Sequence, residues 1–313
     1  MIEIEALTKL YDEVPVVSDV SMRLDAGSIT AIVGTSGSGK STLLRMINRL
    51  VTPTSGRVLI DGTDTRDVEP ATLRRRIGYV IQDHGLFPHW TAARNVATVP
   101  ALLGWPRAEI DARVDELLRL FQLDPGEIGP RYPSQLSGGQ AQRIGVARAL
   151  AARPKVLLMD EPFGALDPVI RAQAQADLRD IQRKAGVTIV LVTHDMAEAI
   201  LLGDRIAVMR AGRLDQVGAP AEILTRPATP FVRDLIGDQD RAFRYLSLLP
   251  LEGLVSPGEA NGDPLPTSAS LAEALARMIW LGQDAVPVAD AAGRRLGVVA
   301  RDAILEAGRQ GGA

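Results

Sequence analysis

The stretch GTSGSGKST at Gly34–Thr42 constrains this chain more than any other, because a strand-like run precedes it and a helix-like run, KSTLLRMINRL, follows it. A glycine loop in that setting lets backbone N–H groups surround an anion at the positive end of a helix. The pattern therefore predicts a phosphate-binding loop. We expect the phosphates of a nucleotide to be held by Gly34, Thr35, Ser36, Gly37, Ser38, Gly39, Lys40, Ser41 and Thr42.

Individual polar residues of this site have expected roles. Lys40 should reach the β- and γ-phosphates of ATP, Ser41 should ligate Mg²⁺, and Thr42 should support the α-phosphate side. In VLLMDEP, Asp160 ends an apolar run and is a second candidate ligand of Mg²⁺, directly or through water. Glu161 follows it and is a candidate to orient or deprotonate the attacking water. A surface Asp-Glu pair is the alternative interpretation.

The histidines divide into one candidate catalytic residue and two others. His194 closes the apolar run TIVLVTHD, where its imidazole could bond the γ-phosphate in the transition state. The alternative is a purely structural hydrogen-bond donor. His84 and His89 have neither cysteine nor a carboxylate pair at ligand spacing, and we expect no metal site there.

Composition excludes several classes of function. The net charge of -3 does not favour nucleic acid, so we expect no nucleic-acid partner. The absence of cysteine excludes disulfides, thiol catalysis and cysteine–zinc sites. The N-terminus lacks the pattern of a signal peptide, and the longest apolar runs are far shorter than the ~20 residues of a membrane-spanning helix. A membrane role is therefore expected to come from another polypeptide.

The order of the apolar runs predicts an α/β fold. The runs in PKVLLMDEP and GVTIVLVTHD are typical of central parallel strands whose carboxyl ends form a site. The N-terminal stretch alternates short β-like runs with turns, whereas residues 91–124 have mostly a helical period. Stretches rich in Gly, Pro, Asp and Ser follow Ile236, and we place a domain boundary near 237–245.

Together these pieces resemble the ATP-binding subunits of ABC transporters over about residues 1–236. The resemblance rests on the phosphate loop, Gln82 after GYVI, LSGGQ at Leu136–Gln140, LLMDEP, GALDP with Asp167, and VTHD. It implies a P-loop NTPase with a RecA-like parallel-sheet core, an N-terminal antiparallel β part and a helical subdomain at about 88–145. It also implies that Gln82 acts in catalysis, sensing the γ-phosphate or its Mg²⁺.

The same resemblance assigns two further residues. Asp167 is the aspartate of the D-loop. Tyr11 occupies the position of an aromatic residue that stacks on adenine, although packing within a strand is an alternative interpretation of this tyrosine.

The LSGGQ loop resembles the family's signature, which each chain presents to the ATP of a second copy. A hydroxyl, backbone N–H groups and the positive end of a helix would clamp a γ-phosphate without proton chemistry. The residues expected to act in trans are Ser137, Gly138, Gly139 and Gln140. The resemblance thus implies an ATP-sandwich dimer of two copies of this chain.

A finer resemblance is to importers of quaternary amines such as glycine betaine, choline and proline betaine. It rests on GLFPHWTAARNVATVPALLGW at Gly85–Trp105 and on DEPFGALDPVIR, while Asp83 and Ala141 depart from the pattern. It implies integral membrane permease subunits that contact the segment from Gly85 to about Trp105. It also implies a periplasmic or extracellular solute-binding protein, and a peripheral location on the cytoplasmic face of the membrane.

The C-terminal pattern at about 253–308, after an expected linker at 237–252, resembles a single CBS module of α+β type. Its residues read SLAEALARMIWLGQDAVPVADAAGRRLGVVARDAIL. Related importers often carry a pair of such modules, and here the pair would have to form between two chains. A domain that only dimerises or packs, without binding a ligand, is the alternative.

Three other functions remain open. One is a soluble ABC ATPase of DNA repair or translation, which usually has a second ATPase unit or long coiled-coil insertions. Another is a nucleotide-gated regulatory protein in which the C-terminal module is the working part. The third is an importer of another small solute, such as an amino acid or a polyamine, which the partner subunits would decide.

Overall fold

The computed structural model describes residues 1–81, 85–164 and 166–310; for residue 310 it describes the backbone but not the side chain. It consists of two compact units, Met1–Val217 and Gly218–Ala313. The predicted boundary near 237–245 therefore lies inside the second unit. The reason is that α10 (Pro220–Thr225) packs against both α11 (Pro230–Ile236) and α12 (Arg241–Leu246).

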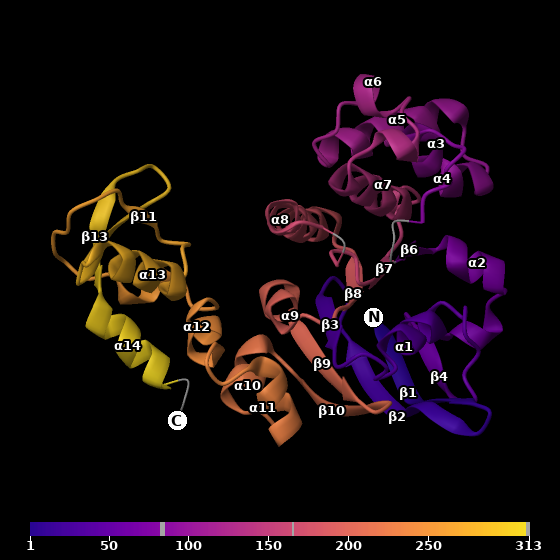
Figure 1. The fold of residues 1–313 in the computed structure, drawn as a ribbon. Coiled ribbons are helices and arrows are strands. Elements are labelled where there is room, and N and C mark those ends of the chain that lie inside the picture. The colour runs from indigo at the N-terminus through magenta and orange to yellow at the C-terminus, as the bar shows by residue number, and fades with distance from the viewer. Residues whose placement is uncertain (82–84, 165, 311–313) are drawn as a thin grey trace. The chain divides into compact units, whose positions relative to one another are not determined.

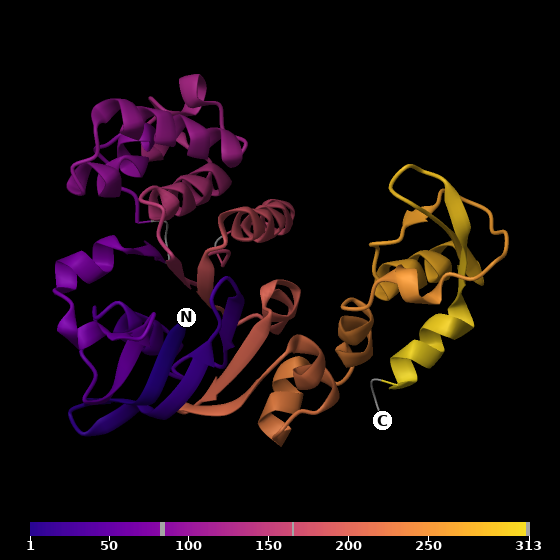
Figure 2. The ribbon, with the colours of Figure 1, turned by 180° about the vertical axis from the view of Figure 1, so that it is seen from behind.

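An antiparallel sheet forms the N-terminal part of the first unit (Figure 1, and from behind in Figure 2). Its strand order is β2-β1-β4-β5. Buried residues alternate with polar ones along β1, where Ile2 and Ile4 lie in the core beside Glu3 and Glu5. The bounds are β1 (Ile2–Tyr11), β2 (Val14–Leu24), β4 (Ser55–Ile60) and β5 (Thr63–Asp64).

A six-stranded sheet of order β10-β9-β3-β8-β7-β6 is the centre of this unit. The strands β9, β3, β8, β7 and β6 pair in parallel. Every residue of β3, β7 and β8 is buried, as expected for parallel strands covered on both faces. The bounds are β3 (Ile29–Val33), β6 (Ile77–Val80), β7 (Val156–Asp160), β8 (Thr188–Val192), β9 (Arg205–Arg210) and β10 (Arg213–Gly218).

The two faces of this sheet belong to different cores. Val156 and Leu158 of β7 join the core shared with the antiparallel sheet and α1 (Lys40–Ile47). Leu157 and Met159, on the opposite face, join a core built with the helices. The period-two alternation of a strand thus divides one apolar run between two layers.

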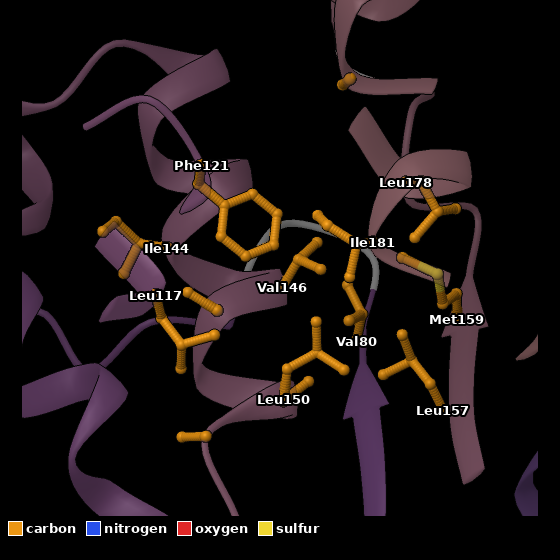
Figure 3. Packing of buried hydrophobic residues seen from close by; sticks show 14 of the residues in the cluster. Val80, Leu117, Phe121, Ile144, Val146, Leu150, Leu157, Met159, Leu178 and Ile181 are labelled. Atoms are coloured by element: carbon orange, nitrogen blue, oxygen red, sulfur yellow. The ribbon is translucent and has the colours of Figure 1, made fainter. Parts of the chain in front are cut away.

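A group of short helices lies together in the first unit (Figure 1). Figure 3 shows how it joins the sheet: Phe121, Val146 and Leu150 pack toward Val80 and Leu157. These helices and the sheet therefore share one core. The bounds are α3 (Ala92–Val96), α4 (Thr98–Leu102), α5 (Arg107–Leu120), α6 (Pro125–Ile128) and α7 (Gly138–Leu150).

The remaining helices of the first unit flank the sheets or connect their strands. Gly186, with φ 61°, ends the longest of them in the left-handed conformation. The bounds are η1 (Thr65–Asp67), α2 (Pro70–Arg75), η2 (Pro133–Gln135), α8 (Pro168–Ala185) and α9 (Met196–Leu202).

The second unit has its own core around a three-stranded sheet of order β11-β12-β13. The expected order of helix, strand, turn, strand and helix is present. The expected linker at 237–252 instead contains the helix α12, whose last residue, Leu246, is buried in this core. The bounds are η3 (Leu251–Leu254), β11 (Leu265–Pro266), α13 (Leu271–Leu281), β12 (Ala285–Ala289), β13 (Arg295–Ala300) and α14 (Arg301–Gln310).

Across the described ranges, no helix combines the length and apolar character needed to span a bilayer.

Candidate nucleotide-binding site

The predicted site residues meet at the carboxyl edge of the central sheet. The strands β3, β8 and β7 are parallel neighbours, so their carboxyl ends lie at the same edge. Backbone bonds continue past the strand ends: the N–H of Glu161 donates to the Val192 carbonyl at 2.9 Å, and that of Thr193 donates to the Ile32 carbonyl at 3.1 Å. The segments that begin with Gly34, Glu161 and Thr193 therefore leave the sheet side by side.

The glycine loop has a backbone that only glycine fits. Gly39, with φ 94°, is the N-cap of α1. A Cβ at Gly34 would lie 2.1 Å from the Met209 carbonyl oxygen, and one at Gly39 would lie 2.4 Å from that of Val16. The loop can therefore approach its neighbours closely while Thr35, Ser36 and Gly37 stay exposed. This places exposed backbone at the start of a helix, as an anion site requires.

Lys40 lies inside the loop. The residue is 5% exposed, and its Nζ donates to the carbonyls of Gly34 at 2.8 Å and Thr35 at 2.9 Å. Burial lowers the pKa of Lys40, while the charges of Glu161 and Asp160 act to raise it. A buried ammonium next to exposed loop backbone is suited to binding a phosphate group.

The candidate Mg²⁺ ligands are in contact. The Ser41 hydroxyl donates to Oδ1 of Asp160 at 2.8 Å, and Asp160 is 2% exposed. Within the described residues there is no group of three or more His, Cys, Asp or Glu that could hold a metal. One hydroxyl and one carboxylate fit Mg²⁺, which completes its octahedron with substrate phosphates and water. Gln82, the third predicted ligand, lies outside the described residues, as does His84.

Arg45 belongs to this cluster and was not predicted. Its guanidinium lies 3.3 Å from Oδ2 of Asp160. A hydrogen bond with Tyr79, together with the charge of Asp160, raises the pKa of Arg45. The sequence held one signal for it, since Arg45 lies four residues after Ser41 on the same face of α1.

Glu161 and His194 form the second part of the site. Nδ1 of His194 lies 3.3 Å from Oε2 of Glu161, with 62% and 24% of the side chains exposed. The backbone of Glu161 is left-handed, with φ 47°, a conformation that is strained for a residue with a side chain. The carboxylate of Glu161 therefore lies against the imidazole of His194.

The signature residues form the N-terminus of α7. Ser137 is the N-cap: its hydroxyl accepts from the Gln140 N–H at 3.2 Å, and the Gln140 side-chain oxygen accepts from the Ser137 N–H at 3.0 Å. The hydroxyl hydrogen of Ser137 is not used by the cap. Ser137 and Gly138 are exposed, whereas Gly139 faces Ile170 of α8. The capping box gives Gln140 a structural role in addition to the predicted one.

Asp167 and Tyr11 differ in their surroundings. Asp167 caps α8, where Oδ1 accepts from the N–H groups of Val169 and Ile170, each at 3.1 Å. Tyr11 is 46% exposed, with the Lys9 ammonium 4.8 Å from its ring centroid. The ring of Tyr11 is therefore accessible to a ligand, and its stacking on adenine stays a prediction.

The segment from Gly85 to about Trp105 combines exposed side chains with one buried polar residue, Asn95. Asn95 is fully buried, accepts from the Phe87 N–H at 2.8 Å, and donates to the carbonyls of Trp90 and Thr91. In the same segment, the ring centroids of Phe87 and Trp90 lie 4.6 Å apart, and Phe87 is 39% exposed. His89 belongs to this aromatic group. Phe87 and His89 are exposed, whereas Trp90 is half-buried, and a docking role of this segment stays a prediction.

Comparisons with known proteins agree on one family. The family model described as ABC transporter matches residues 17–164. The glycine betaine uptake system ATP-binding protein YehX of Escherichia coli is 47% identical over 98% of this chain and 100% of its own length. The osmoprotectant import ATP-binding protein OsmV of Salmonella typhimurium is 46% identical over 96% of this chain and 79% of its own.

One similar solved structure contains a bound nucleotide. The dimeric ATP-binding cassette MJ0796, in a post-hydrolysis state bound to ADP and Pi, aligns with a TM-score of 0.63 at 33% identity. The alignment covers 70% of this chain and 99% of that one.

The two signature glycines give a matched test of this geometry. A Cβ at Gly139 would lie 2.5 Å from Cγ2 of Ile170, whereas one at Gly138 would meet nothing within 4 Å. Because Ile170 is β-branched and stiff, Gly139→Ala should destabilise the protein by about 1–3 kcal/mol. Gly138→Ala should leave stability unchanged or slightly higher. Chemical denaturation of both variants checks this, and equal stabilities would contradict the contact between α7 and α8.

Proposed function

Because the chain belongs to the family of ABC transporter ATP-binding proteins, we propose that it energises an importer of quaternary amines through separate membrane subunits. The observation that carries this proposal is the full-length similarity to a glycine betaine uptake ATP-binding protein, which extends through both units. The activity is ATP hydrolysis, coupled to transport.

The geometry of the site supports distinct roles for its residues. Lys40 and the backbone of the glycine loop hold the β- and γ-phosphates, and the exposed ring of Tyr11 stacks on the adenine. Ser41 and Asp160, with Gln82, would hold Mg²⁺, which neutralises charge on the phosphate oxygens. Arg45 keeps the carboxylate of Asp160 in place.

Glu161 and His194 complete the chemistry. The Glu161 carboxylate accepts a proton from the attacking water or orients it, and His194 donates to the γ-phosphate oxygen as charge develops. The contact between the two side chains fixes the carboxylate relative to the imidazole. The strained backbone of Glu161 is typical of a residue whose side chain must point in a defined direction, even though this conformation lowers the stability of the fold.

The dimer follows from the signature. Ser137, Gly138 and the N-terminus of α7 would bind the γ-phosphate held by a second copy, because this exposed helix end has donors but no acid or base. Asp167 lies at the N-terminus of the neighbouring helix α8, which packs against α7. Two nucleotides would then lie between two chains.

Glu161→Gln tests the role of the carboxylate. Since glutamine cannot accept the proton, ATP turnover should fall by about 10²–10⁴-fold while ATP binding persists, and an ATP-bound dimer should accumulate. Phosphate release and size-exclusion chromatography measure the two effects. Glu109→Gln, at an exposed position of α5, is the control. Near-normal hydrolysis by Glu161→Gln would remove Glu161 from this role.

The membrane subunits would dock on the segment from Gly85 to about Trp105. Its exposed Phe87, Leu102 and Leu103 are 39%, 60% and 42% exposed, and the buried Asn95 keeps the loop rigid. The protein would accordingly lie at the cytoplasmic face of the membrane, with a solute-binding protein on the opposite side.

Transport specificity has its own test. The protein should be reconstituted in vesicles with its membrane subunits and solute-binding protein, and ATP turnover measured with added solutes. Glycine betaine, choline or proline betaine should stimulate turnover, whereas methionine and a polyamine should not. Stimulation of turnover by methionine or by the polyamine would contradict the quaternary-amine assignment. The same holds if none of the five solutes stimulates turnover.

The second unit would act as a CBS-like regulatory module that pairs with that of a second chain. Its helix α13 is apolar nearly all round, with Glu273 and Arg277 as its charged residues. One side lies in the core, while Ile279 and Trp280 are 64% and 89% exposed. A helix with two apolar sides is normally covered on both.

The arrangement of α13 favours a second copy as the cover. Its exposed side carries the small Ala276, followed by the large Ile279 and Trp280. Two such helices in antiparallel contact would place the large residues of each over the alanine of the other.

Trp280→Glu tests this pairing in the full-length protein without nucleotide. Loss of this large exposed aromatic residue should weaken self-association by about thirtyfold or more, as measured by sedimentation velocity. Phe243→Glu is the matched control, since Phe243 is 47% exposed on α12. An unchanged dissociation constant for Trp280→Glu, or an equal loss with Phe243→Glu, would contradict the proposal.

A further inference from the structure

Glu198 is a buried charge that the proposed chemistry does not use. Among the residues that the structure describes, three charged ones are at most 7% exposed: Lys40, Asp160 and Glu198. The first two belong to the nucleotide site. Glu198 lies on α9, four residues after His194. A buried carboxylate is costly unless hydrogen bonds satisfy it, so its partners indicate what it holds in place.

Its partners come from two other elements. Nε2 of Gln175, on α8, donates to Oε1 of Glu198 at 3.2 Å. The side chain of Thr193, which directly precedes His194, also interacts with the carboxylate and acts to lower its pKa. Oγ1 of Thr193 accepts from the Asp195 N–H at 3.0 Å, so its single hydrogen is available to the carboxylate. All three side chains belong to buried residues.

This trio, Glu198, Thr193 and Gln175, fixes the peptide before His194. On the sheet side, the Thr193 N–H is bonded to the Ile32 carbonyl, so the residue is held from both directions. The imidazole itself is 62% exposed and has little packing to hold it. Its position over Glu161 is therefore set mainly by the backbone on which it stands.

Two members of the trio share one pocket with the reacting groups. The pocket is lined by Thr193 and Glu198 together with Glu161 and His194, and by the charged residues Arg171 and Asp195. A displacement of Thr193 would therefore change the distance between the side chains of Glu161 and His194.

We propose that Glu198 is a positioning residue for His194, which it holds through Thr193 and ties to α8 through Gln175. The proposal rests on the proposed ATP hydrolysis. In this role the buried carboxylate keeps the imidazole at the distance from Glu161 that the reaction requires. Since α8 begins at the Asp167 cap, the trio also connects the histidine to the helix that starts at the predicted D-loop.

Two threonines of the same strand region provide a matched kinetic test. Thr193 and Thr188 are 2% and 4% exposed. Thr188 is the first residue of β8 and accepts a bond from the Gly27 N–H, whereas Thr193 directly follows the last residue of this strand. Thr193→Val and Glu198→Ala should lower kcat for ATP by about tenfold to a hundredfold, because small misplacements of catalytic groups have effects of this size. The KM should change less than twofold. Thr188→Val should keep the wild-type kcat.

The conservative variant separates positioning from charge. In Glu198→Gln, the amide oxygen can still accept from Thr193, so most of the activity should return. If Glu198→Ala does not fold, Thr193→Val and Glu198→Gln carry the test. An equal loss of kcat in Thr188→Val and Thr193→Val, or wild-type kcat in Thr193→Val, would overturn the proposal.

A spectroscopic measurement is independent of turnover. The chain has 3 histidines, so the imidazole NMR signal of His194 can be assigned by its loss in His194→Ala. That signal should shift in Thr193→Val and stay in place in Thr188→Val. If wild-type protein hydrolyses no ATP, the proposed function fails. If it hydrolyses ATP but the His194 signal does not move in Thr193→Val, the positioning role fails.

Discussion

The parallel pairing of β3, β8 and β7 is the constraint on which the rest of the site depends. Ile32 and Asp160 both pair with Val192, so the three strands end at the same level. The carbonyls of Val192 in β8 and Ile32 in β3 then accept hydrogen bonds from the first residues of the outgoing loops, Glu161 and Thr193. The glycine loop, the Asp-Glu pair and the histidine are thereby placed beside one another without any long side chain having to reach.

This alignment also explains where the fold tolerates buried charge. Lys40 uses loop carbonyls, Asp160 uses Ser41 and Arg45, and Glu198 uses Gln175 and Thr193. Burial raises the pKa of Glu198, whereas its two hydrogen bonds counter that rise by favouring the charged form. Each group would be costly alone, so its partners are as much a part of the site as the residues that touch the nucleotide.

The candidate site was largely predictable because its motifs are local. A loop such as Gly34–Thr42 carries its backbone requirements and its polar groups in consecutive residues. Arg45, Asn95 and Glu198 were missed because their partners come from distant segments or from an unforeseen loop. The composition of the segment at 237–252 predicts a linker, but Leu246 and Leu251 of this segment are buried in the second core. Gln82 lies outside the described residues, and its role stays a prediction.

The sequence by itself determined the family, the phosphate loop and the identity of the acid, base and metal-ligand candidates, since each is encoded by adjacent residues with a fixed chemical need. The tertiary structure decided which of them touch. It brought Ser41 to Asp160, placed His194 at 3.3 Å from Glu161, exposed Tyr11, and put Glu198 behind the histidine. The physical reason is that hydrogen bonds and burial depend on distances between chain segments, and the pairing of the strands fixes those distances.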